Sequence, residues 1–137
     1  MSKSEVGIGL VGSGFMGRCH ANAFRSVSGL FDVACEPVLR VIADATPELA
    51  AQAARNLGFA RCTDSWKVLV ADEEVDIVAI TAPNVLHAPI ALAAIETGKT
   101  IYCEKPLATT AAIALEMAEA AEAANVVTLV GFNFLRN

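Results

Sequence analysis

A lysine placed just beyond an apolar segment carries the strongest chemical signal in this sequence. Glu104, Lys105 and Pro106 directly follow the apolar run 100–103, which predicts that the lysine stands at the end of a buried strand. Moving an ammonium group out of water is costly unless a partner compensates, so a lysine in this position requires a chemical reason. Such a lysine can carry or release a proton, and Pro106 makes the turn rigid by fixing φ and removing a backbone donor. Together with a glycine-rich turn near the N-terminus, the three residues predict a redox site.

The glycine-rich turn lies at residues 12–17 and follows the apolar run 5–11, which predicts a strand, a tight turn and then a helix. In a dinucleotide-binding turn, the first glycine permits the tight turn and the second lets the backbone approach a pyrophosphate. The third glycine allows close packing of the helix on the strand, and the helix N-terminus provides an anion site. We therefore expect dinucleotide binding, with a purely structural turn as the alternative. The expected cofactor contacts here are Gly12, Gly14, Phe15, Met16 and Gly17.

Asp44 follows the second apolar run, 38–43. A carboxylate at the carboxyl end of this strand can accept both hydroxyls of an adenosine ribose and repels a 2′-phosphate, which predicts NAD as the cofactor. No arginine directly follows Asp44, and NADP is the second choice. The separation of Asp44 from Gly17 exceeds the usual spacing of about 20 residues, and we assign the excess to an insertion over residues 28–37. The alternative role for Asp44 is an N-cap of the next helix.

A further group of candidate cofactor contacts follows the apolar run 75–80. The group consists of Thr81, Ala82, Pro83, Asn84 and His87. Ligands of a doubly wound sheet bind outside the carboxyl ends of its strands, so we expect this group to border the same crevice as the glycine turn and the lysine. Two alternatives stay open: His87 can be a helix-surface histidine packed by its neighbours, and Asn84 can be an ordinary N-cap.

The whole sequence alternates between strand and helix patterns. Strands are predicted over 5–11, 38–43, 60–62, 75–80, 100–103 and 126–130. Helices are predicted from the glycine turn to about 27, over 46–57, from about 65, and over 84–96 and 110–124, with 28–37 as a loop or a helix extension. This alternation with near-continuous apolar strands is typical of an α/β fold, a doubly wound parallel sheet of the Rossmann type. We expect about six strands in the order 3-2-1-4-5-6, with helices on both faces.

Local capping residues support two of the helix boundaries. Thr46 can cap the second helix, Pro47 suits its first position, and Glu48 complements its dipole. Gly58 supplies the stop of that helix, and Asp64 is predicted to cap the third.

The composition disfavours several functional classes. The sequence is 55% hydrophobic and 18% charged, which disfavours disorder and favours a buried sheet covered by helices. The net charge is −5 and the basic residues are scattered, so we expect no nucleic-acid partner. The apolar segments are too short and interrupted to span a membrane, and the N-terminus lacks a signal-peptide pattern, which predicts a cytoplasmic protein. The spacing of the four cysteines and two histidines fits no metal site, and we expect none.

Several of these motifs together resemble the Gfo/Idh/MocA oxidoreductases, a family that includes glucose-fructose oxidoreductase and inositol dehydrogenase. The resemblance is carried by the segment Thr-Ala-Pro-Asn-Val-Leu-His at 81–87, by Ala94, by Gly98 and Lys99, and by Glu-Lys-Pro-Leu-Ala at 104–108. It covers nearly the whole chain, from the glycine turn to residues 131–133, which resemble the family's crossing into its second domain. On this basis, residues 1–131 are a dinucleotide-binding domain and residues 132–137 begin the crossover to a substrate domain.

The resemblance implies a nicotinamide-dependent dehydrogenase or reductase that acts on sugars, polyols or related small carbonyl compounds. It implies that Glu104 reaches the nicotinamide ribose, that Lys105 lies beside the reacting substrate carbon and oxygen, and that Pro106 follows a cis peptide bond. Asn133, at the crossover, is the last expected cofactor contact. Family members continue into a second domain that completes the substrate site and forms homo-oligomers, so we expect residues 1–137 to bind cofactor without turnover.

Two other readings of the residues remain. The first is a nucleotide-sensing Rossmann module in which the redox residues no longer act. The second is a methyltransferase-like domain that binds S-adenosylmethionine, which shares the glycine turn and the acidic residue but gives no reason for Glu104, Lys105 and Pro106.

Overall fold

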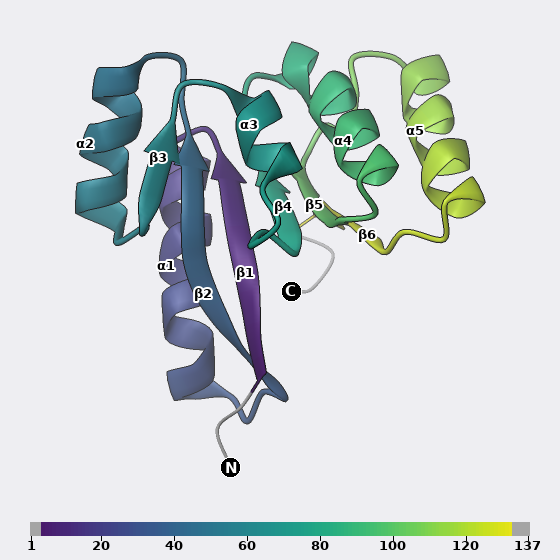
Figure 1. Cartoon of the computed structure of the whole chain (residues 1–137). Coiled ribbons are helices and arrows are strands. Elements are labelled where there is room, and N and C mark those ends of the chain that lie inside the picture. Colours follow the sequence, from purple (N-terminus) through teal and green to yellow (C-terminus); the bar gives the residue numbers. More distant parts are fainter. Residues whose placement is uncertain (1–3, 133–137) are drawn as a thin grey trace.

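Strands and helices alternate throughout residues 4–132, which are the part of the chain described by the computed structural model of the protein (Figure 1). The elements are β1 (Ser4–Val11), α1 (Phe15–Leu30), β2 (Cys35–Ala43), α2 (Pro47–Leu57), β3 (Arg61–Thr63), α3 (Trp66–Ala71), β4 (Ile77–Ile80), the 3₁₀ turn η1 (Asn84–Leu86), α4 (His87–Glu96), β5 (Thr100–Glu104), α5 (Ala111–Ala123) and β6 (Thr128–Gly131).

The strands form one six-stranded sheet in the order β3-β2-β1-β4-β5-β6, and every neighbouring pair is parallel. The predicted fold class and strand order are therefore confirmed. The order reverses between β1 and β4, since the chain builds outward from β1 to β3 and then returns to the other side of β1. The carboxyl ends of β1 and β4 diverge into separate connections at this switch point, which is where doubly wound sheets bind ligands.

Helices cover both faces of the sheet, as predicted. On one face, α1 and α2 pack against a cluster that includes Ile8, Leu10 and Ile42. On the other face, α3, α4 and α5 pack against a larger cluster that includes Val78 and Ile80. Neighbouring positions on a strand point to opposite faces, so the continuous apolar runs of the central strands supply both clusters at once.

The face that carries α1 is incompletely covered over β5 and β6. Tyr102 and Leu129 are paired neighbours on these strands, and Leu129 remains 52% exposed. An apolar cavity of about 480 Å³ lies between α1 and this part of the sheet, lined by residues of α1, β5 and β6 together with Val33 and Pro37.

The second helix begins and ends as its capping residues predict. The Thr46 hydroxyl accepts a hydrogen bond from the backbone N–H of Leu49 at 3.3 Å, and Pro47 occupies the first turn. Gly58 ends the helix with a left-handed φ of 81°, a conformation that favours glycine.

Several predicted boundaries differ from the structure. In the region 28–37, predicted as a loop or a helix extension, α1 does extend to Leu30, but β2 already begins at Cys35. Asp64 does not cap α3: the N-cap is Ser65, whose backbone N–H donates to the Thr63 hydroxyl, so the turn closes without Asp64. The predicted helix 84–96 is divided into η1 and α4.

The burial of Leu69 generates a stability prediction. Leu69 on α3 is 0% exposed, whereas Leu115 on α5 is 59% exposed. We expect Leu69→Ala to lower the free energy of unfolding by about 2–5 kcal/mol, because it removes buried methyl groups and leaves a cavity. The matched substitution Leu115→Ala should cost less than about 1 kcal/mol. Urea unfolding followed by circular dichroism measures both, and equal losses would show that α3 does not contribute to the core in this way.

Candidate cofactor site

The glycine turn is held tightly against the sheet. Gly12 has a φ of 96°, and a side chain there would also meet the carbonyl oxygen of Thr81 at 2.8 Å. A Cβ on Gly17 would lie 2.0 Å from the carbonyl oxygen of Gly12, so α1 packs on the turn only because this position has no side chain. By contrast, a Cβ at Gly14 would meet nothing within 4 Å, which leaves open space above the turn. These are the conditions in which a backbone can approach a phosphate group.

The N-terminus of α1 suits a pyrophosphate. Its N-cap is Gly14, which provides no side-chain cap, and its first turn contains no acidic residue. A helix of 16 residues with unprotected N–H groups at its start presents partial positive charge there. Phe15 is exposed and Met16 is half-buried at this end, so both are available to a ligand. The turn and the helix start therefore fit a dinucleotide cofactor.

Asp44 lies against the glycine turn rather than on the next helix. One of its carboxylate oxygens, Oδ2, accepts hydrogen bonds from the backbone N–H of Ser13, at 2.9 Å, and from the Ser13 hydroxyl. Its other oxygen, Oδ1, accepts from the Ala45 N–H at 2.7 Å. The alternative role of Asp44 as an N-cap is wrong, because Thr46 caps α2.

The hydrogen bonds to Asp44 favour its ionised form. Partial burial alone raises the pKa of Asp44, but the hydrogen bonds from the Ser13 side chain and from the backbones of Ala45 and Ser13 outweigh burial. They hold the pKa below its ordinary value of 3.8. Sequence reasoning did not include Ser13 among the site residues. The available signal was its position between two glycines of the turn, next to the expected phosphate site.

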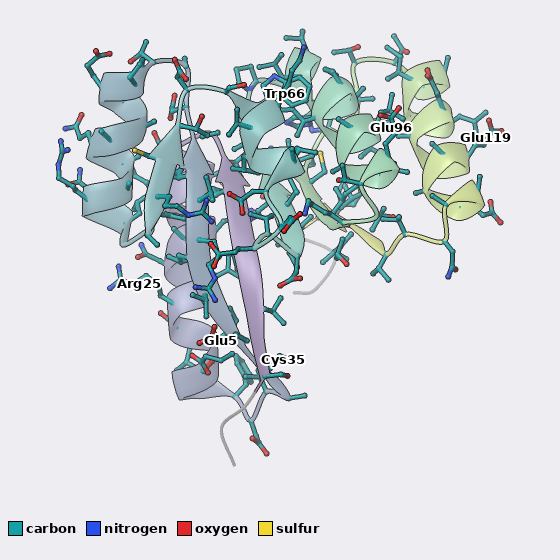
Figure 2. All side chains as sticks on the ribbon, in the orientation of Figure 1. Glu5, Arg25, Cys35, Trp66, Glu96 and Glu119 are labelled. Atoms are coloured by element: carbon teal, nitrogen blue, oxygen red, sulfur yellow. The ribbon has the colours of Figure 1, made fainter. Side chains whose placement is uncertain are left out.

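A cavity at the switch point brings several predicted residues together. It has a volume of about 240 Å³ and lies beyond the ends of β1, β2 and β4. Its lining includes the predicted residues Gly12, Asp44, Ala82 and Pro83, and also Asp64, Trp66 and Leu86, which sequence reasoning missed. Trp66 begins α3 at the sheet edge where the strand arrows end (Figure 2). An apolar wall beside a carboxylate suits an adenosine group.

Thr81 supports the glycine turn. Its hydroxyl lies 2.7 Å from the carbonyl oxygen of Gly12 and 3.0 Å from that of Val11, and it can donate to either. Its backbone N–H also donates to the Val11 carbonyl. Thr81 thus connects the end of β4 to the end of β1.

Asn84 is exposed, and the alternative that it caps a helix is wrong, because the N-caps of η1 and α4 are Pro83 and Leu86.

His87 connects the loop after β4 with the turn 104–106. It is buried, which excludes the alternative of a helix-surface histidine. Its Nδ1 lies 2.9 Å from the carbonyl oxygen of Pro106 and its Nε2 lies 2.9 Å from that of Ala82. Carbonyl oxygens only accept hydrogen bonds, so a neutral ring can satisfy one of them and a protonated ring both. Through these contacts His87 fixes the position of the 104–106 turn beside the end of β4, and its direct contact with a cofactor stays a prediction.

The turn 104–106 separates a buried carboxylate from an exposed lysine. The peptide bond between Lys105 and Pro106 is cis, as the resemblance implies. Lys105 is exposed in this chain, so the sequence-based argument that its ammonium group is desolvated is wrong here: the strand ends at Glu104 and the lysine side chain extends into solvent. Glu104 is the buried member, only 6% exposed.

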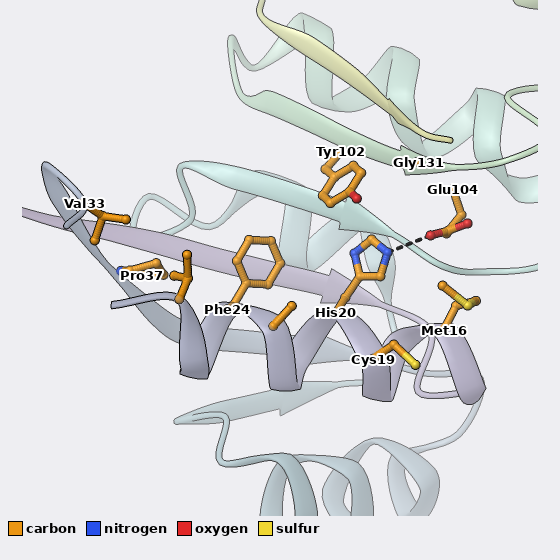
Figure 3. A pocket seen from close by; sticks show the side chains of 11 residues that line it. Met16, Cys19, His20, Phe24, Val33, Pro37, Tyr102, Glu104 and Gly131 are labelled. Carbon is orange, nitrogen blue, oxygen red and sulfur yellow. Dashed lines mark hydrogen bonds and ion pairs between the residues drawn. The ribbon is translucent and has the colours of Figure 1, made fainter. Parts of the chain in front are cut away.

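Glu104 has a partner that sequence reasoning missed. Nε2 of His20, on α1, lies 2.8 Å from Oε1 of Glu104 (Figure 3). The signal in the sequence was the position of His20 three residues after Gly17, which places both on the sheet-facing side of one helix.

Among residues 4–132, no group of three or more His, Cys, Asp or Glu side chains could hold a metal ion. No helix in the same residues is long and apolar enough to cross a membrane.

Burial, with Glu104 beside it, raises the pKa of the Cys103 thiol to about 12, so this thiol stays protonated at neutral pH. The predicted contact Asn133 lies outside the described residues.

Comparison with known proteins defines the family. The family model of the Gfo/Idh/MocA proteins, an oxidoreductase family with an NAD-binding Rossmann fold, matches residues 6–132. The chain belongs to this family. The resemblance inferred from the 81–87 and 104–108 segments is therefore confirmed, and the Gfo/Idh/MocA fold agrees with the strand order described above.

Several proteins similar to this chain are named as dehydrogenases. Levoglucosan dehydrogenase of Pseudarthrobacter phenanthrenivorans is 46% identical over 133 residues, covering 96% of this chain and 34% of that protein. Inositol 2-dehydrogenase 4 of Saccharopolyspora erythraea is 39% identical over 138 residues, covering 99% and 38%. A structure of levoglucosan dehydrogenase in complex with NADH and levoglucosan has a TM-score of 0.94 at 44% identity, covering 97% of this chain and 36% of that one. The chain thus spans about a third of the length of these relatives.

The lowered pKa of Asp44 generates a pH-dependent prediction. Its ionised form contributes stability that is fully present above the ordinary value of 3.8 and is lost as pH falls through the lower folded-state value. We expect Asp44→Asn to lower the free energy of unfolding by about 1 kcal/mol at pH 7, a modest value because the side chain is partly solvated. The difference from the wild type should shrink below pH 4. Urea unfolding at several pH values measures it, with the exposed Glu119→Gln as control; a difference that grows on acidification would contradict the prediction.

Proposed function

We propose that this chain is the cofactor domain of an NAD-dependent dehydrogenase that transfers hydride between nicotinamide and a sugar, a polyol or a related small carbonyl compound. The observation that carries the proposal is the convergence of three features at one sheet edge: the uncapped start of α1, the carboxylate of Asp44 and the turn 104–106. The relatives named as levoglucosan and inositol dehydrogenases support the substrate class.

The roles of the residues follow from their positions. The first turn of α1 and the open space at Gly14 receive the pyrophosphate. Asp44 accepts hydrogen bonds from the adenosine ribose hydroxyls. Since the Ser13 hydroxyl donates to Oδ2 of Asp44 in the free chain, it must rotate away when the ribose binds to that oxygen. Trp66 and Leu86 offer an apolar surface to the adenine. A 2′-phosphate beside Asp44 would meet a negative charge, which favours NAD over NADP.

Lys105 is the proposed catalytic residue. Nicotinamide supplies the acceptor or donor of hydride. In the longer protein, Lys105 would move the proton of the substrate hydroxyl group: when an alcohol is oxidised, its carbon loses hydride, the hydroxyl proton passes to the Lys105 side chain and a carbonyl group forms, and in reduction Lys105 returns the proton to oxygen. The exposed position of Lys105 in this chain leaves it accessible to a substrate. Glu104 is proposed to hold the nicotinamide ribose, and Pro106 to fix the turn between them.

The length of the relatives supports a larger protein. We infer that residues 1–131 form the dinucleotide-binding domain and that residues 132–137 begin a crossover in which Asn133 contacts the cofactor. A second domain would supply the remaining walls of the substrate site and the contacts of a homo-oligomer. Hydride transfer requires both carbons in near-attack contact, so the chain of 137 residues should bind cofactor without turnover. The cytoplasm is the proposed compartment, consistent with four free cysteine thiols.

Cofactor preference tests the role of Asp44. We expect calorimetry with residues 1–137 to show NAD binding at least about tenfold tighter than NADP binding, a difference of about 1.4 kcal/mol. Asp44→Ser should narrow this ratio by removing the charge that repels the 2′-phosphate. The exposed substitution Leu115→Ala serves as the control and should preserve the ratio. Tighter binding of NADP, or of S-adenosylmethionine, would contradict the proposal.

Turnover tests the role of Lys105. In the longer protein, Lys105→Ala should lower kcat by about 10²–10⁴-fold, the usual contribution of a positioned acid or base, while NAD affinity stays nearly unchanged. NADH formation with inositol, levoglucosan and several sugars provides the measurement. A variant that loses NAD binding but retains normal turnover at saturating NAD would contradict the proposal. A longer protein that binds NAD but oxidises none of these compounds would instead favour the nucleotide-sensing alternative.

A further inference from the structure

A histidine and a glutamate from distant parts of the sequence form a buried pair between α1 and the end of β5. Nε2 of His20 and Oε1 of Glu104 are 2.8 Å apart, and the two side chains expose only 5% and 8% of their area. Figure 3 shows the imidazole pointing along α1 toward the carboxylate, with the rings of Phe24 and Tyr102 nearby. The ring centroids of His20 and Tyr102 are 4.6 Å apart. A carboxylate removed from water in this way requires a hydrogen-bond donor, and His20 provides one.

Two further contacts restrict the Glu104 carboxylate. Its Oε2 accepts a hydrogen bond from the backbone N–H of Lys105 at 3.3 Å. The carboxylate also lies against Gly131 of β6, where a Cβ would approach Oε1 to 2.9 Å. The carboxylate is therefore held by the helix, by its own turn and by the neighbouring strand. Among the described residues, His20 is the only one whose side chain makes a hydrogen bond to this carboxylate.

The surroundings of His20 indicate which ring nitrogen carries the proton. Nδ1 of His20 is buried and has no hydrogen-bond partner among residues 4–132. A protonated ring would leave a buried N–H without an acceptor, whereas the neutral ring with its proton on Nε2 leaves only a lone pair. The neutral tautomer donates from Nε2 to Glu104. His20 and Glu104 both line the cavity of about 480 Å³ beside α1, whose other lining residues are mainly apolar.

We propose that His20 is a positioning residue that holds the Glu104 carboxylate in the orientation required to accept hydrogen bonds from the nicotinamide ribose. The inference rests on the proposed function, in which Glu104 makes that contact. Without the Nε2–H donor, the buried carboxylate would lose this hydrogen bond and turn away from the position in which it can accept from the ribose. The adenosine half of the cofactor would be unaffected, because Asp44 and the start of α1 hold it independently.

The test compares two ligands that share the adenosine diphosphate group. NAD includes the nicotinamide ribose, and ADP does not. For residues 1–137, calorimetry should show that His20→Leu weakens NAD binding by about tenfold or more, the effect of losing a hydrogen bond to a charged group. ADP binding should change by less than about twofold. His20→Gln should retain most NAD affinity, because its terminal amide nitrogen reaches the position of Nε2 and can still donate.

The matched control is Phe24→Leu. Phe24 lines the same cavity and lies 6.4 Å from the His20 ring, centroid to centroid, but makes no hydrogen bond to Glu104. This variant should leave both affinities near those of the wild type. Circular dichroism establishes whether each variant is folded.

Several results would overturn the inference. It fails if His20→Leu binds NAD like the wild type, or if it loses NAD and ADP affinity equally. If His20→Leu does not fold, His20→Asn replaces it. The shorter Asn side chain places its amide nitrogen near the position of Nδ1 of the imidazole, so His20→Asn should weaken NAD binding while His20→Gln preserves it. Equal NAD affinities of the Asn and Gln variants would overturn the inference. A wild-type chain that binds neither ligand would overturn the proposed function together with this inference, whereas normal NAD binding in all His20 variants would overturn the inference alone.

Discussion

The contact between the start of α1 and the carboxyl ends of β1 and β4 is the constraint on which the rest of the site depends. A methyl group at Gly17 would overlap the carbonyl oxygen of Gly12, and the Thr81 hydroxyl donates toward the same part of the chain. The helix can lie this close only because residue 17 is a glycine and has no side chain. Its first turn is thereby brought to the sheet edge, and its sheet-facing side reaches β5. The proposed phosphate site and the placement of Glu104 therefore depend on the same contact.

Much of the fold could be predicted because its determinants are local. Apolar runs mark the strands, and alternation with helices restricts them to a parallel sheet with right-handed connections. The boundaries of α2 were predictable for the same reason, since Thr46 and Gly58 act on neighbouring backbone groups. Asp64 shows the limit of such reasoning. A carboxylate before a helix is a common cap, but Thr63 already satisfies the N–H of Ser65, and this choice depends on how the β3 strand ends.

The site was predictable in its residue types but not in its interactions. The segments 81–84 and 104–106 were expected at one edge, and the structure brings them together through His87, whose ring joins Ala82 to Pro106. That bridging role could not be inferred from spacing, because it depends on the depth to which α4 is buried. The role of His20 could not be predicted for a similar reason, because its partner Glu104 lies 84 residues later in the sequence, at the end of β5. The exposure of Lys105 likewise depends on where β5 ends, which differs from the prediction by one residue.

The separation of His20 and Glu104 along the chain also affects how the protein folds. Interactions between the glycine turn and Asp44 join residues 31 positions apart, so they can form as soon as β1 and β2 pair. The pair between α1 and β5 spans 84 positions and must wait until β4 has inserted beside β1 and β5 has added to it. Closing so long a loop is entropically costly and slows the late steps of folding relative to the early ones. During synthesis from the N-terminus, the contact between Ser13 and Asp44 can therefore form before Glu104 has been made.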